Sequence, residues 1–420
     1  MRYIEMEMPK AGQTAVVGMS GGVDSTLTAL LLKEKGIKTI GVTMSLWDGH
    51  LPEANSREPH GREACYGPGE EENIESCRKF CLEHDIPYYV IKLSEQYNKS
   101  VLEYFKNEYR AGRTPNPCIQ CNRYLKFGAL IDGIRMLKID FDYFCTGHYA
   151  KIVRPERGIY GTSSRPCMIA CAADITKDQT YFLYRIPSEI LEKVRFPLAS
   201  FKKKEVFDLA KKAGLEAAMR EESQDFISGE YLDALFADKP SIPGDIIDLD
   251  GHVLGKHRGI EHYTIGQRKG LGVSVSYPVY VQAIDAKKNL IVLAPNDALN
   301  SSALIADDFV WPGGIEPIKK DSNEDYEALV KIRLAAKPVK ARISRLYDEK
   351  EQNENNAAEK KDIAIKNKIP ENHNTTENQK SGKWLIKFEE PQRAVTPGQS
   401  AVLYKDGIMI GGGIIIKAIK

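Results

Sequence analysis

The sequence lacks a long apolar run, a strong excess of charge and a dense set of cysteines. No stretch approaches the roughly 20 apolar residues that a helix needs to cross a bilayer, and the start, MRYIEMEMPKAGQ, has no apolar core of a signal peptide. The formal net charge is +1, so a surface for a polyanion has to be a local patch. Eight cysteines in 420 residues do not indicate a disulfide scaffold. We expect a cytoplasmic protein without membrane contact, whose exposed cysteines take part in sulfur, redox or metal chemistry.

The first half of the chain alternates apolar runs of strand length with helical patterns. This alternation is typical of a parallel sheet covered by helices on both faces. The expected strands are residues 15–19, 39–44, 88–93, 141–146 and 168–172. The expected helices are residues 25–35, 74–84, 101–110, 123–136 and 204–213. We therefore predict an α/β fold with a doubly wound parallel sheet over residues 1–220.

After about residue 221 the pattern changes to short strands separated by glycines, and from about residue 277 it is entirely β. The change predicts a small central domain over residues 221–280 and a β-barrel over residues 281–420. Residues 349–383 interrupt the barrel and are rich in Asn, Glu, Lys and Gln, with almost nothing apolar. This composition predicts a disordered insertion between two barrel strands.

The segment GMSGGVDST joins the first expected strand to the first expected helix. A helix N-terminus offers unpaired N–H groups and a partial positive charge. Gly21 and Gly22 let the backbone approach an anion, and Ser20 and Ser25 add hydroxyl groups, so we predict a phosphate cradle. Asp24 would repel phosphate unless a cation sat between them, which suggests that Asp24 holds Mg²⁺. The alternative is a tight glycine turn without function.

Two cysteines lie three residues apart in GRTPNPCIQCNRYLKFG, residues 112–128. Near a helix start both thiols face the same side, and the helix dipole, together with Arg113 and Arg123, favours the thiolate form. Cys118 and Cys121 therefore suit sulfur transfer, in which one thiol carries a persulfide and the other resolves it. They also suit two ligands of a metal or iron–sulfur site. A buried pair of small apolar residues is the third interpretation.

The two motifs together resemble a known family. SGGxDS between a strand and a helix is similar to the PP-loop of ATP pyrophosphatases, which split ATP between the α and β phosphates and adenylate a substrate oxygen. In combination with TPNPxxxCNxxxKF it resembles the tRNA-specific 2-thiouridylases (the MnmA or TrmU family). Further segments match the family in order: GVTMSLW, CTGHYAKI, TKDQTYFLY, HYTIGQRKGLGV, VKIRLAAKPVKA and PQRAVTPGQSAVLY.

The resemblance implies ATP-dependent 2-thiolation of the wobble uridine, position 34, in the tRNAs for Glu, Gln and Lys. Uridine O2 is adenylated with release of pyrophosphate, and a persulfide or sulfide sulfur then displaces AMP. A cysteine desulfurase or a sulfur-carrier protein is the implied donor. Carried over by position, the implied catalytic residues are Cys121 and Cys118. The implied ATP-binding residues are Gly18, Met19, Ser20, Gly21, Gly22, Val23, Asp24, Ser25, Met44 and Gly147.

The same resemblance places tRNA contacts at several separate positions. The implied tRNA-facing residues are His148, Lys177, Asp178, Gln179, Arg333, Leu334 and Gln399. Three short basic clusters, residues 202–204, 256–258 and 268–269, lie in or near these matching segments. A single cluster is most often a solvated face, but three of them favour binding of RNA phosphates.

The chain departs from the family at its sulfur site. The family has a second cysteine in a segment like ESQDICFI, whereas residues 222–231 read ESQDFISGEY, and Ser228 cannot hold a persulfide. The family also often has Asp at the position of Cys118. Cys118 and Cys121 would then replace the separated pair, or would join Cys65 around a [4Fe–4S] cluster with one open iron. The other candidates are a PP-loop sulfur transferase acting at another tRNA position and a non-catalytic tRNA-binding relative. The intact SGGVDS argues against the last.

Overall fold

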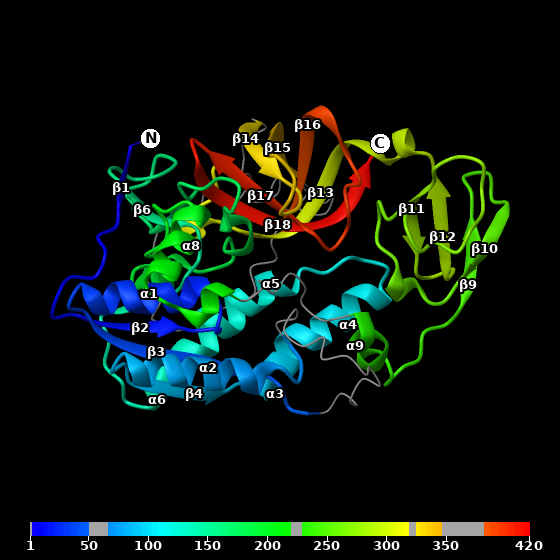
Figure 1. Cartoon of the computed structure of the whole chain (residues 1–420). Coiled ribbons are helices and arrows are strands. Elements are labelled where there is room, and N and C mark those ends of the chain that lie inside the picture. Colours follow the sequence, from blue (N-terminus) through cyan, green and yellow to red (C-terminus); the bar gives the residue numbers. More distant parts are fainter. Residues whose placement is uncertain (1, 50–65, 220–228, 319–324, 347–381) are drawn as a thin grey trace, which may run out of the picture.

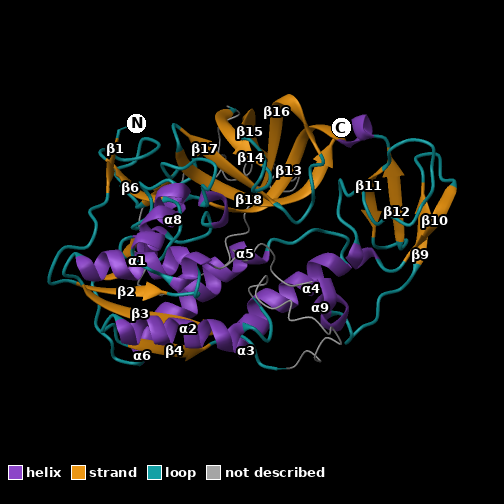
Figure 2. Ribbon diagram, viewed as in Figure 1, coloured by secondary structure: helices purple, strands orange, loops and turns teal. Residues whose placement is uncertain are grey.

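The computed structural model describes residues 2–49, 66–219, 229–318, 325–346 and 382–420 of the chain (Figure 1). Within these ranges, only the backbone is described for residues 218–219 and 229–231. The described strands form three sheets of nine, four and five strands. Figure 2 shows the helices gathered around the N-terminal sheet, while the rest of the chain is mostly strands. In the described ranges, no helix has the length and apolar character needed to span a membrane.

The N-terminal domain contains a five-stranded, fully parallel sheet with the order β4-β3-β2-β5-β8. Its strands are β2 (Thr14–Gly18), β3 (Lys38–Ser45), β4 (Tyr88–Lys92), β5 (Tyr143–Cys145) and β8 (Val194–Arg195). Side chains of β2 alternate between the two faces, so Ala15 and Val17 enter one core cluster and Val16 enters another. Both faces of the sheet are therefore covered, and the predicted doubly wound α/β fold is confirmed.

Helices supply both covering layers. The α-helices before the central domain are α1 (Val23–Glu34), α2 (Glu70–Glu83), α3 (Ser94–Tyr97), α4 (Glu103–Arg110), α5 (Pro117–Gln120), α6 (Leu130–Met136), α7 (Ser188–Leu191) and α8 (Lys203–Lys212). Two π-helical stretches, η1 (Asn98–Leu102) and η2 (Cys121–Ala129), continue α3 into α4 and α5 into α6. Short 3₁₀ helices occur at Thr180–Phe182, Glu216–Met219, Ile260–His262, Asn296–Leu299 and Pro312–Gly314. The cores against β2 contain residues of α1, α2 and α8 on one face and of η2 and α6 on the other.

One strand expected in the parallel sheet belongs elsewhere. β7 (Met168–Ala170) lies between β6 (Lys151–Pro155) and β18 (Ile408–Ile419) and is antiparallel to both. All three residues of β7 are buried. Because a short, fully apolar run has no alternation, its sequence cannot indicate which sheet it joins. β1 (Tyr3–Glu5) pairs with β6 at the outer edge of the same sheet.

The C-terminal domain is a closed barrel of six strands. Its order is β18-β13-β16-β15-β14-β17, and β17 pairs with β18 to close the ring. The remaining bounds are β13 (Asn300–Val310), β14 (Tyr326–Lys331), β15 (Val339–Leu346), β16 (Lys383–Arg393) and β17 (Ser400–Lys405). Most of the expected insertion, residues 349–383, lies outside the described residues, but Lys383 already begins β16.

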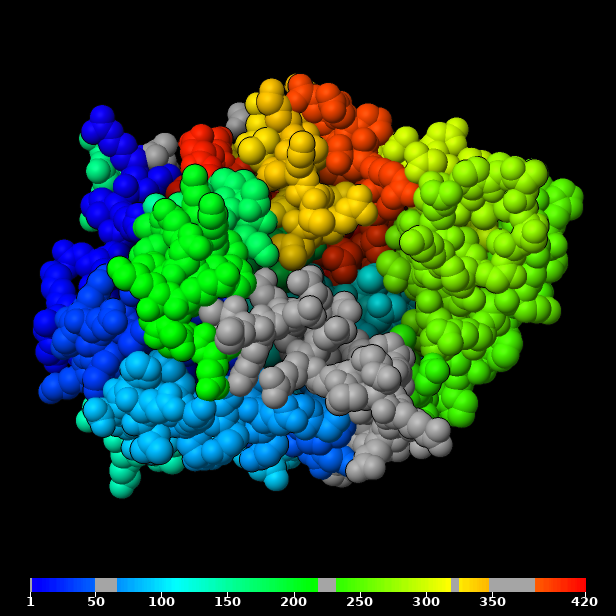
Figure 3. Space-filling view, viewed as in Figure 1, coloured from blue at the N-terminus to red at the C-terminus, as the bar shows by residue number. Residues whose placement is uncertain are grey.

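The central domain has its own four-stranded sheet, ordered β10-β9-β12-β11, and follows helix α9 (Gly229–Leu235). Its strands are β9 (Gly244–Ile247), β10 (Val253–His257), β11 (Tyr280–Asp285) and β12 (Leu290–Ala294). We expected β11 and β12 in the barrel. Instead, β12 pairs in parallel with β9 and antiparallel with β11, so both strands belong to the central sheet. The expected boundary at 280/281 therefore cuts this sheet at the start of β11. The space-filling view shows the domain as a lobe beside the barrel (Figure 3).

Candidate functional site

The glycine loop lies between β2 and α1, as the sequence predicts. Gly21 has φ +79°, a left-handed conformation that favours glycine, and Gly22 is the exposed N-cap of α1 with φ −81° and ψ 160°. Among the described residues, no side chain caps this helix end. The first N–H groups of this twelve-residue helix therefore lie at the glycine loop without a side-chain cap, which is an arrangement that can bind phosphate groups.

Hydroxyl groups of the loop hold its own shape. The Ser20 N–H donates to Ser25 Oγ at 3.2 Å, and Ser25 Oγ donates to the Gly22 carbonyl at 3.0 Å. Thr26 Oγ1 donates to the same carbonyl at 3.0 Å. Ser20 is exposed, whereas Ser25 and Thr26 are buried. Ser25 thus stabilises the turn, and the exposed Ser20 is the better placed of the two expected hydroxyls for a ligand.

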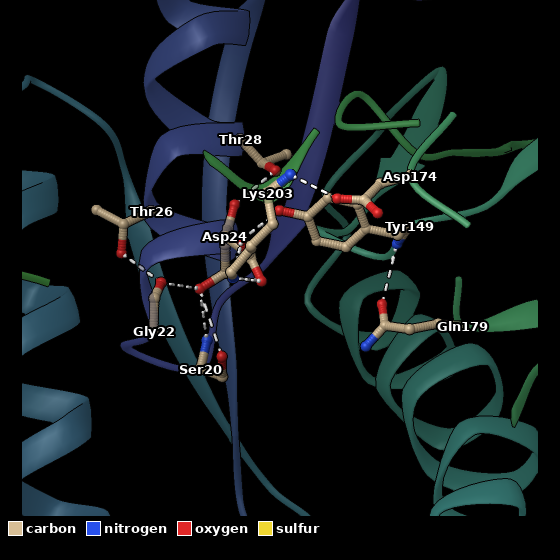
Figure 4. Close-up of polar contacts among 10 residues, drawn as sticks. Ser20, Gly22, Asp24, Thr26, Thr28, Tyr149, Asp174, Gln179 and Lys203 are labelled. Carbon is tan, nitrogen blue, oxygen red and sulfur yellow. Dashed lines mark hydrogen bonds and ion pairs between the residues drawn. The ribbon is translucent and has the colours of Figure 1, made fainter. Parts of the chain in front are cut away.

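Asp24 lies in the first turn of α1, and among the described residues Lys203 and Tyr149 reach it from distant segments (Figure 4). Lys203 Nζ lies 2.7 Å from both carboxylate oxygens, and Tyr149 Oη donates to Oδ1 at 2.9 Å. The Lys203 side chain is 10% exposed and that of Asp24 is 29% exposed. The cation beside Asp24 in this structure is therefore a lysine ammonium group, at the place where we expected Mg²⁺.

The other expected ATP-binding residues lie at the same edge of the sheet. Gly18 ends β2, Met44 is the second-last residue of β3, and Gly147 lies two residues after β5. Because these strands are parallel and adjacent, their carboxyl ends meet at one edge, where α/β sheets bind ligands. A Cβ atom on Gly147 would lie 2.7 Å from the Asp24 carbonyl carbon, so only glycine permits this packing against α1.

Cys118 and Cys121 lie at the start of the long helical segment formed by α5, η2 and α6. The Asn116 side chain caps this start by accepting the Ile119 N–H at 3.4 Å. Both cysteines are half-buried, and Cys121 packs against the core cluster that contains residues of η2 and α6. The π-helical geometry begins at Cys121, and such stretches are frequent at functional sites.

The expected electrostatic support for these thiols is only partly present. Arg113 Nε donates to Glu108 Oε2 at 2.7 Å, and this hydrogen bond raises the pKa of the Arg113 guanidinium. Its positive charge is therefore matched by a carboxylate and contributes little to the field at the cysteines. The Arg123 guanidinium carbon lies 5.4 Å from the centre of the Tyr124 ring. Cys65, the third expected cluster ligand, lies outside the described residues, as do Glu222–Ser228.

His148 is buried inside the N-terminal domain. It is 8% exposed, lies against the rings of Phe127 and Phe196, and forms a 2.7 Å hydrogen bond between Nδ1 and Thr146 Oγ1. Burial lowers the pKa of His148 well below its ordinary value, so its ring is neutral near pH 7. The imidazole does not lie on the surface that we expected to face tRNA.

The segment expected at Lys177–Gln179 is also mostly internal. Lys177 is exposed, but Asp178 is 8% exposed and accepts the N–H groups of Ala172 and Thr180. Gln179 Oε1 accepts the Tyr149 N–H at 2.9 Å (Figure 4). Gln179 thus holds the tyrosine that donates to Asp24. Of this group Lys177 is exposed, Gln179 is half-buried and Asp178 is buried.

The residues that follow join the N-terminal domain to the barrel. Thr180 Oγ1 lies 3.0 Å from Tyr404 Oη, and Tyr181 Oη donates to the Ser400 carbonyl at 3.1 Å. Tyr184 Oη lies 3.1 Å from Ser400 Oγ. The motif TKDQTYFLY therefore builds an interface with β17 more than a surface for a partner.

Of the three barrel residues, Leu334 is exposed, whereas Arg333 and Gln399 are half-buried and hydrogen-bonded within the chain. Leu334 is 39% exposed, and Arg333 Nη2 donates to the Arg393 carbonyl at 3.3 Å while remaining half-buried. Gln399 Nε2 donates to the carbonyls of Thr114 and Pro115, both at 3.1 Å. Gln399 thus connects the barrel to the loop that leads into Cys118.

Lys203 was missed as a site residue because it lies in the run Lys202–Lys204, which we took as a basic surface cluster. The neighbouring lysines are exposed, but Lys203 shares the buried face of α8 with Val206 and Ala210. Spacings of three and seven residues mark one face of a helix. This periodicity is the signal that could have identified Lys203 as the inward-facing lysine of the three.

The sheet, the glycine loop at its carboxyl edge and the attached barrel define a class, an α/β PP-loop protein extended by two β domains. Comparisons agree with this class. The sequence matches the tRNA methyl transferase HUP domain over residues 13–228, the tRNA methyl transferase PRC-barrel domain over 230–295 and the aminomethyltransferase beta-barrel domain over 347–415.

Curated relatives identify the family. The chain is 41% identical to a tRNA-specific 2-thiouridylase MnmA of Endomicrobium trichonymphae over 96% of its own length and 98% of the relative. It is 37% identical to the protein of the same name from Chloroflexus aurantiacus, again over 96% and 98%. The chain therefore belongs to the MnmA family of tRNA-specific 2-thiouridylases.

Two solved structures align with about half of the chain, at low identity and low TM-score. A 4-thiouridine synthetase in complex with RNA and ATP shares 17% identity, with a TM-score of 0.28 over 51% of this chain and 44% of that one. The NH₃-dependent NAD synthetase of Campylobacter jejuni shares 16% identity, with a TM-score of 0.27 over 50% and 66%.

Proposed function

We propose that the protein catalyses the ATP-dependent 2-thiolation of the wobble uridine, position 34, of tRNA. The observation that supports this most strongly is the membership of the thiouridylase family over nearly the whole chain, together with an uncapped glycine loop and a half-buried cysteine pair. The substrates are the tRNAs for Glu, Gln and Lys, and the products are 2-thiouridine, AMP and pyrophosphate. A protein that modifies tRNA in this way is expected in the cytoplasm.

The first step is adenylation of the base. Uridine O2 attacks the α-phosphorus of ATP, the bond to the β-phosphate oxygen breaks, and pyrophosphate leaves. The N–H groups at Gly22 and the start of α1 stabilise the departing negative charge, and Gly18, Met44 and Gly147 border the nucleotide. The target base has to leave its stack, because O2 is not accessible within the anticodon stack.

Mg²⁺ accompanies ATP in this proposal and neutralises phosphate charge when it is bound. Asp24 fits poorly as its protein ligand, because both of its oxygens already lie 2.7 Å from the Lys203 ammonium and one accepts the Tyr149 hydroxyl. We therefore assign the ion to the phosphate oxygens and water, and no step of the reaction depends on a bond between the metal and Asp24.

The second step uses the cysteine pair. A terminal persulfide sulfur on Cys121 attacks uridine C2, and AMP leaves with the C2–O bond electrons. The Cys118 thiolate then attacks the Cys121 sulfur, the S–S bond to the nucleoside breaks, and 2-thiouridine leaves as a Cys118–Cys121 disulfide forms. A thiol reductant restores the pair, and a cysteine desulfurase or a sulfur-carrier protein reloads it.

An iron–sulfur site is the alternative source of sulfur. Cys118 and Cys121 would then hold a [4Fe–4S] cluster together with Cys65, which lies outside the described residues. Iron and acid-labile sulfide in the anaerobically purified protein would favour this alternative, and their absence would favour the persulfide pair.

The tRNA surface in this proposal lies over the exposed residues of the matched segments. Lys177, Leu334 and the edge of Arg333 are on the surface, and exposed basic side chains of the central domain add charge that binds RNA phosphates. These basic residues are Lys256, Arg258, Arg268 and Lys269. The buried His148 and Asp178 and the half-buried Gln179 lie behind this surface in the proposal, and Gln399 positions the cysteine loop.

The proposal is tested in a host that lacks its own wobble-uridine thiolase. The intact chain should restore 2-thiouridine at position 34, detected by mass spectrometry of nucleosides from the purified tRNA. With purified tRNA, AMP and pyrophosphate should form in equal amounts. Sulfur at a different tRNA position would identify a different PP-loop transferase, and tRNA binding without ATP turnover would identify a non-catalytic relative.

A further inference from the structure

The phosphate loop SGGVDS has no lysine of its own, yet a lysine from a distant helix reaches it. Lys203 is 179 residues from Asp24 in the sequence and contacts both of its oxygens at 2.7 Å. We propose that Lys203 is a phosphate-binding residue of the ATP site and that it, in place of a metal ion bound to Asp24, neutralises this carboxylate. This inference rests on the proposed use of ATP.

The ammonium group is held in position from several sides. The Lys203 N–H donates to Asp174 Oδ2 at 2.9 Å, and the Glu205 side chain accepts the Lys202 N–H at 2.7 Å, so the first turn of α8 is anchored. The Lys203 ammonium lies 5.5 Å from the centre of the Tyr149 ring and 5.0 Å from that of Phe207. Two aromatic rings beside a cation attract it and restrict its motion.

The Lys203 ammonium group and a metal ion would compete for the Asp24 carboxylate. Mg²⁺ binds carboxylate oxygens at about 2.0–2.1 Å and requires near-octahedral geometry. Asp24 Oδ1 already accepts from Lys203 and Tyr149, and Oδ2 accepts from Lys203. A divalent cation on either oxygen would lie close to the ammonium group and be repelled by it, so the ion pair and metal ligation by Asp24 exclude each other.

The ion pair between Lys203 and Asp24 would assist phosphate binding at the N-terminus of α1. A negative Asp24 in the first turn of α1 opposes an incoming phosphate, and the ammonium group cancels this charge without leaving the cradle. An ammonium group has three donors, and in this proposal the carboxylate and a phosphate oxygen share them when ATP binds. Asp24 and Tyr149 then act as positioning residues for Lys203.

The structure also connects this lysine to the interface with the barrel. Tyr149 donates to Asp24, and the Tyr149 N–H is held by Gln179. Gln179 directly precedes the Thr180–Tyr181 segment that contacts β17. The position of the ammonium group thus depends on residues that link the nucleotide site to the barrel.

The test is calorimetric binding of a non-hydrolysable α,β-methylene analogue of ATP to the purified full chain, with Mg²⁺ and with EDTA. Lys203→Met should weaken binding by about tenfold or more, as expected for loss of a charged hydrogen bond. Lys204→Met, an exposed neighbour on the same helix, should leave it unchanged. Lys203→Arg, which keeps the charge, should retain most of the affinity and separates a lost contact from misfolding.

Asp24→Asn distinguishes the two cations. If Lys203 is the partner of Asp24, Asp24→Asn keeps the gain in affinity that Mg²⁺ provides. Disappearance of that gain in Asp24→Asn, or unchanged affinity in a folded Lys203→Met, would overturn the inference. Failure of the intact chain to bind the analogue would instead contradict the proposed function.

Discussion

Two pairs of closely spaced cysteines lie on helices of the same α/β domain and have different surroundings. Cys77 and Cys81 on α2 are each 1% exposed, and Cys81 Sγ lies 3.5 Å from Met19 Sδ. Cys118 and Cys121 begin the α5–η2 helical segment and are half-buried. Burial raises the pKa of Cys81 to about 12, so its thiol stays neutral at any physiological pH. Position at a helix start and exposure, more than spacing, distinguish the candidate sulfur carriers.

The largest expected effect comes from removing one thiol of the half-buried pair. Cys118→Ser and Cys121→Ser should each reduce 2-thiouridine to background, because serine neither carries nor resolves a persulfide. The measurement is the nucleoside content of tRNA from a thiolase-deficient host. Cys171→Ser, at a third half-buried cysteine in the described part of the chain, is the matched control and should retain thiolation. Normal thiolation by Cys118→Ser would show that Cys121 works with a different thiol.

The difference in reactivity between the pairs should also be large. At pH 8 a thiol with a pKa of about 12 is ionised to only about one part in 10⁴. Brief treatment of the folded chain with iodoacetamide, followed by peptide mass spectrometry, should therefore label Cys118 and Cys121 and spare Cys81 and Cys145. Equal labelling of all four in the folded state would remove the contrast on which the assignment depends.

The buried thiols should make stability depend on pH above neutrality. Burial raises the pKa of Cys81 and Cys145 from their ordinary value of 9.0 to about 12. Below pH 9 both states hold the proton, and between pH 9 and 12 only the unfolded state loses it, so stability falls as pH rises. Urea unfolding should be less steeply pH-dependent in Cys81→Ala than in the intact chain. Identical slopes would show that this thiol does not contribute.

A smaller effect is expected at the contact between the barrel and the cysteine loop. Gln399→Ala removes two hydrogen bonds to the carbonyls of Thr114 and Pro115 and should cost roughly 1–2 kcal/mol of stability. Its thiolation rate should fall and the alkylation rate of Cys118 should change, with little change in the Kd for tRNA. Weaker tRNA binding with unaltered cysteine reactivity would instead make Gln399 a direct tRNA contact.

Local patterns predicted much of the N-terminal domain. The alternation of strands and helices placed β2, β3, β4 and β5, and the glycine motif placed the loop before α1. The sheet to which a strand belongs was harder to predict from the sequence. β7 and β12 are short apolar runs, and their partner strands are determined by contacts distant in the sequence. The strand pattern was right at β11 and β12, but the domain to which they belong was not.

The candidate site was predictable where the backbone alone determines it. Glycines at Gly21 and Gly147 fit a left-handed turn and a close approach to α1. The partners of polar side chains were not predictable, because they depend on packing. Asp178 and His148 have the residue types of a surface site, yet both are buried and hydrogen-bonded inside the domain.

The most direct test of the central claim follows one sulfur atom through the protein. The full chain is loaded with a cysteine desulfurase and cysteine, repurified, and analysed by peptide mass spectrometry before and after addition of ATP and tRNA. The account predicts an added sulfur on the peptide that contains Cys118 and Cys121, and its transfer to uridine 34 only when ATP is present. Sulfur on a different cysteine, or retention of the sulfur after ATP and tRNA are added, would contradict it.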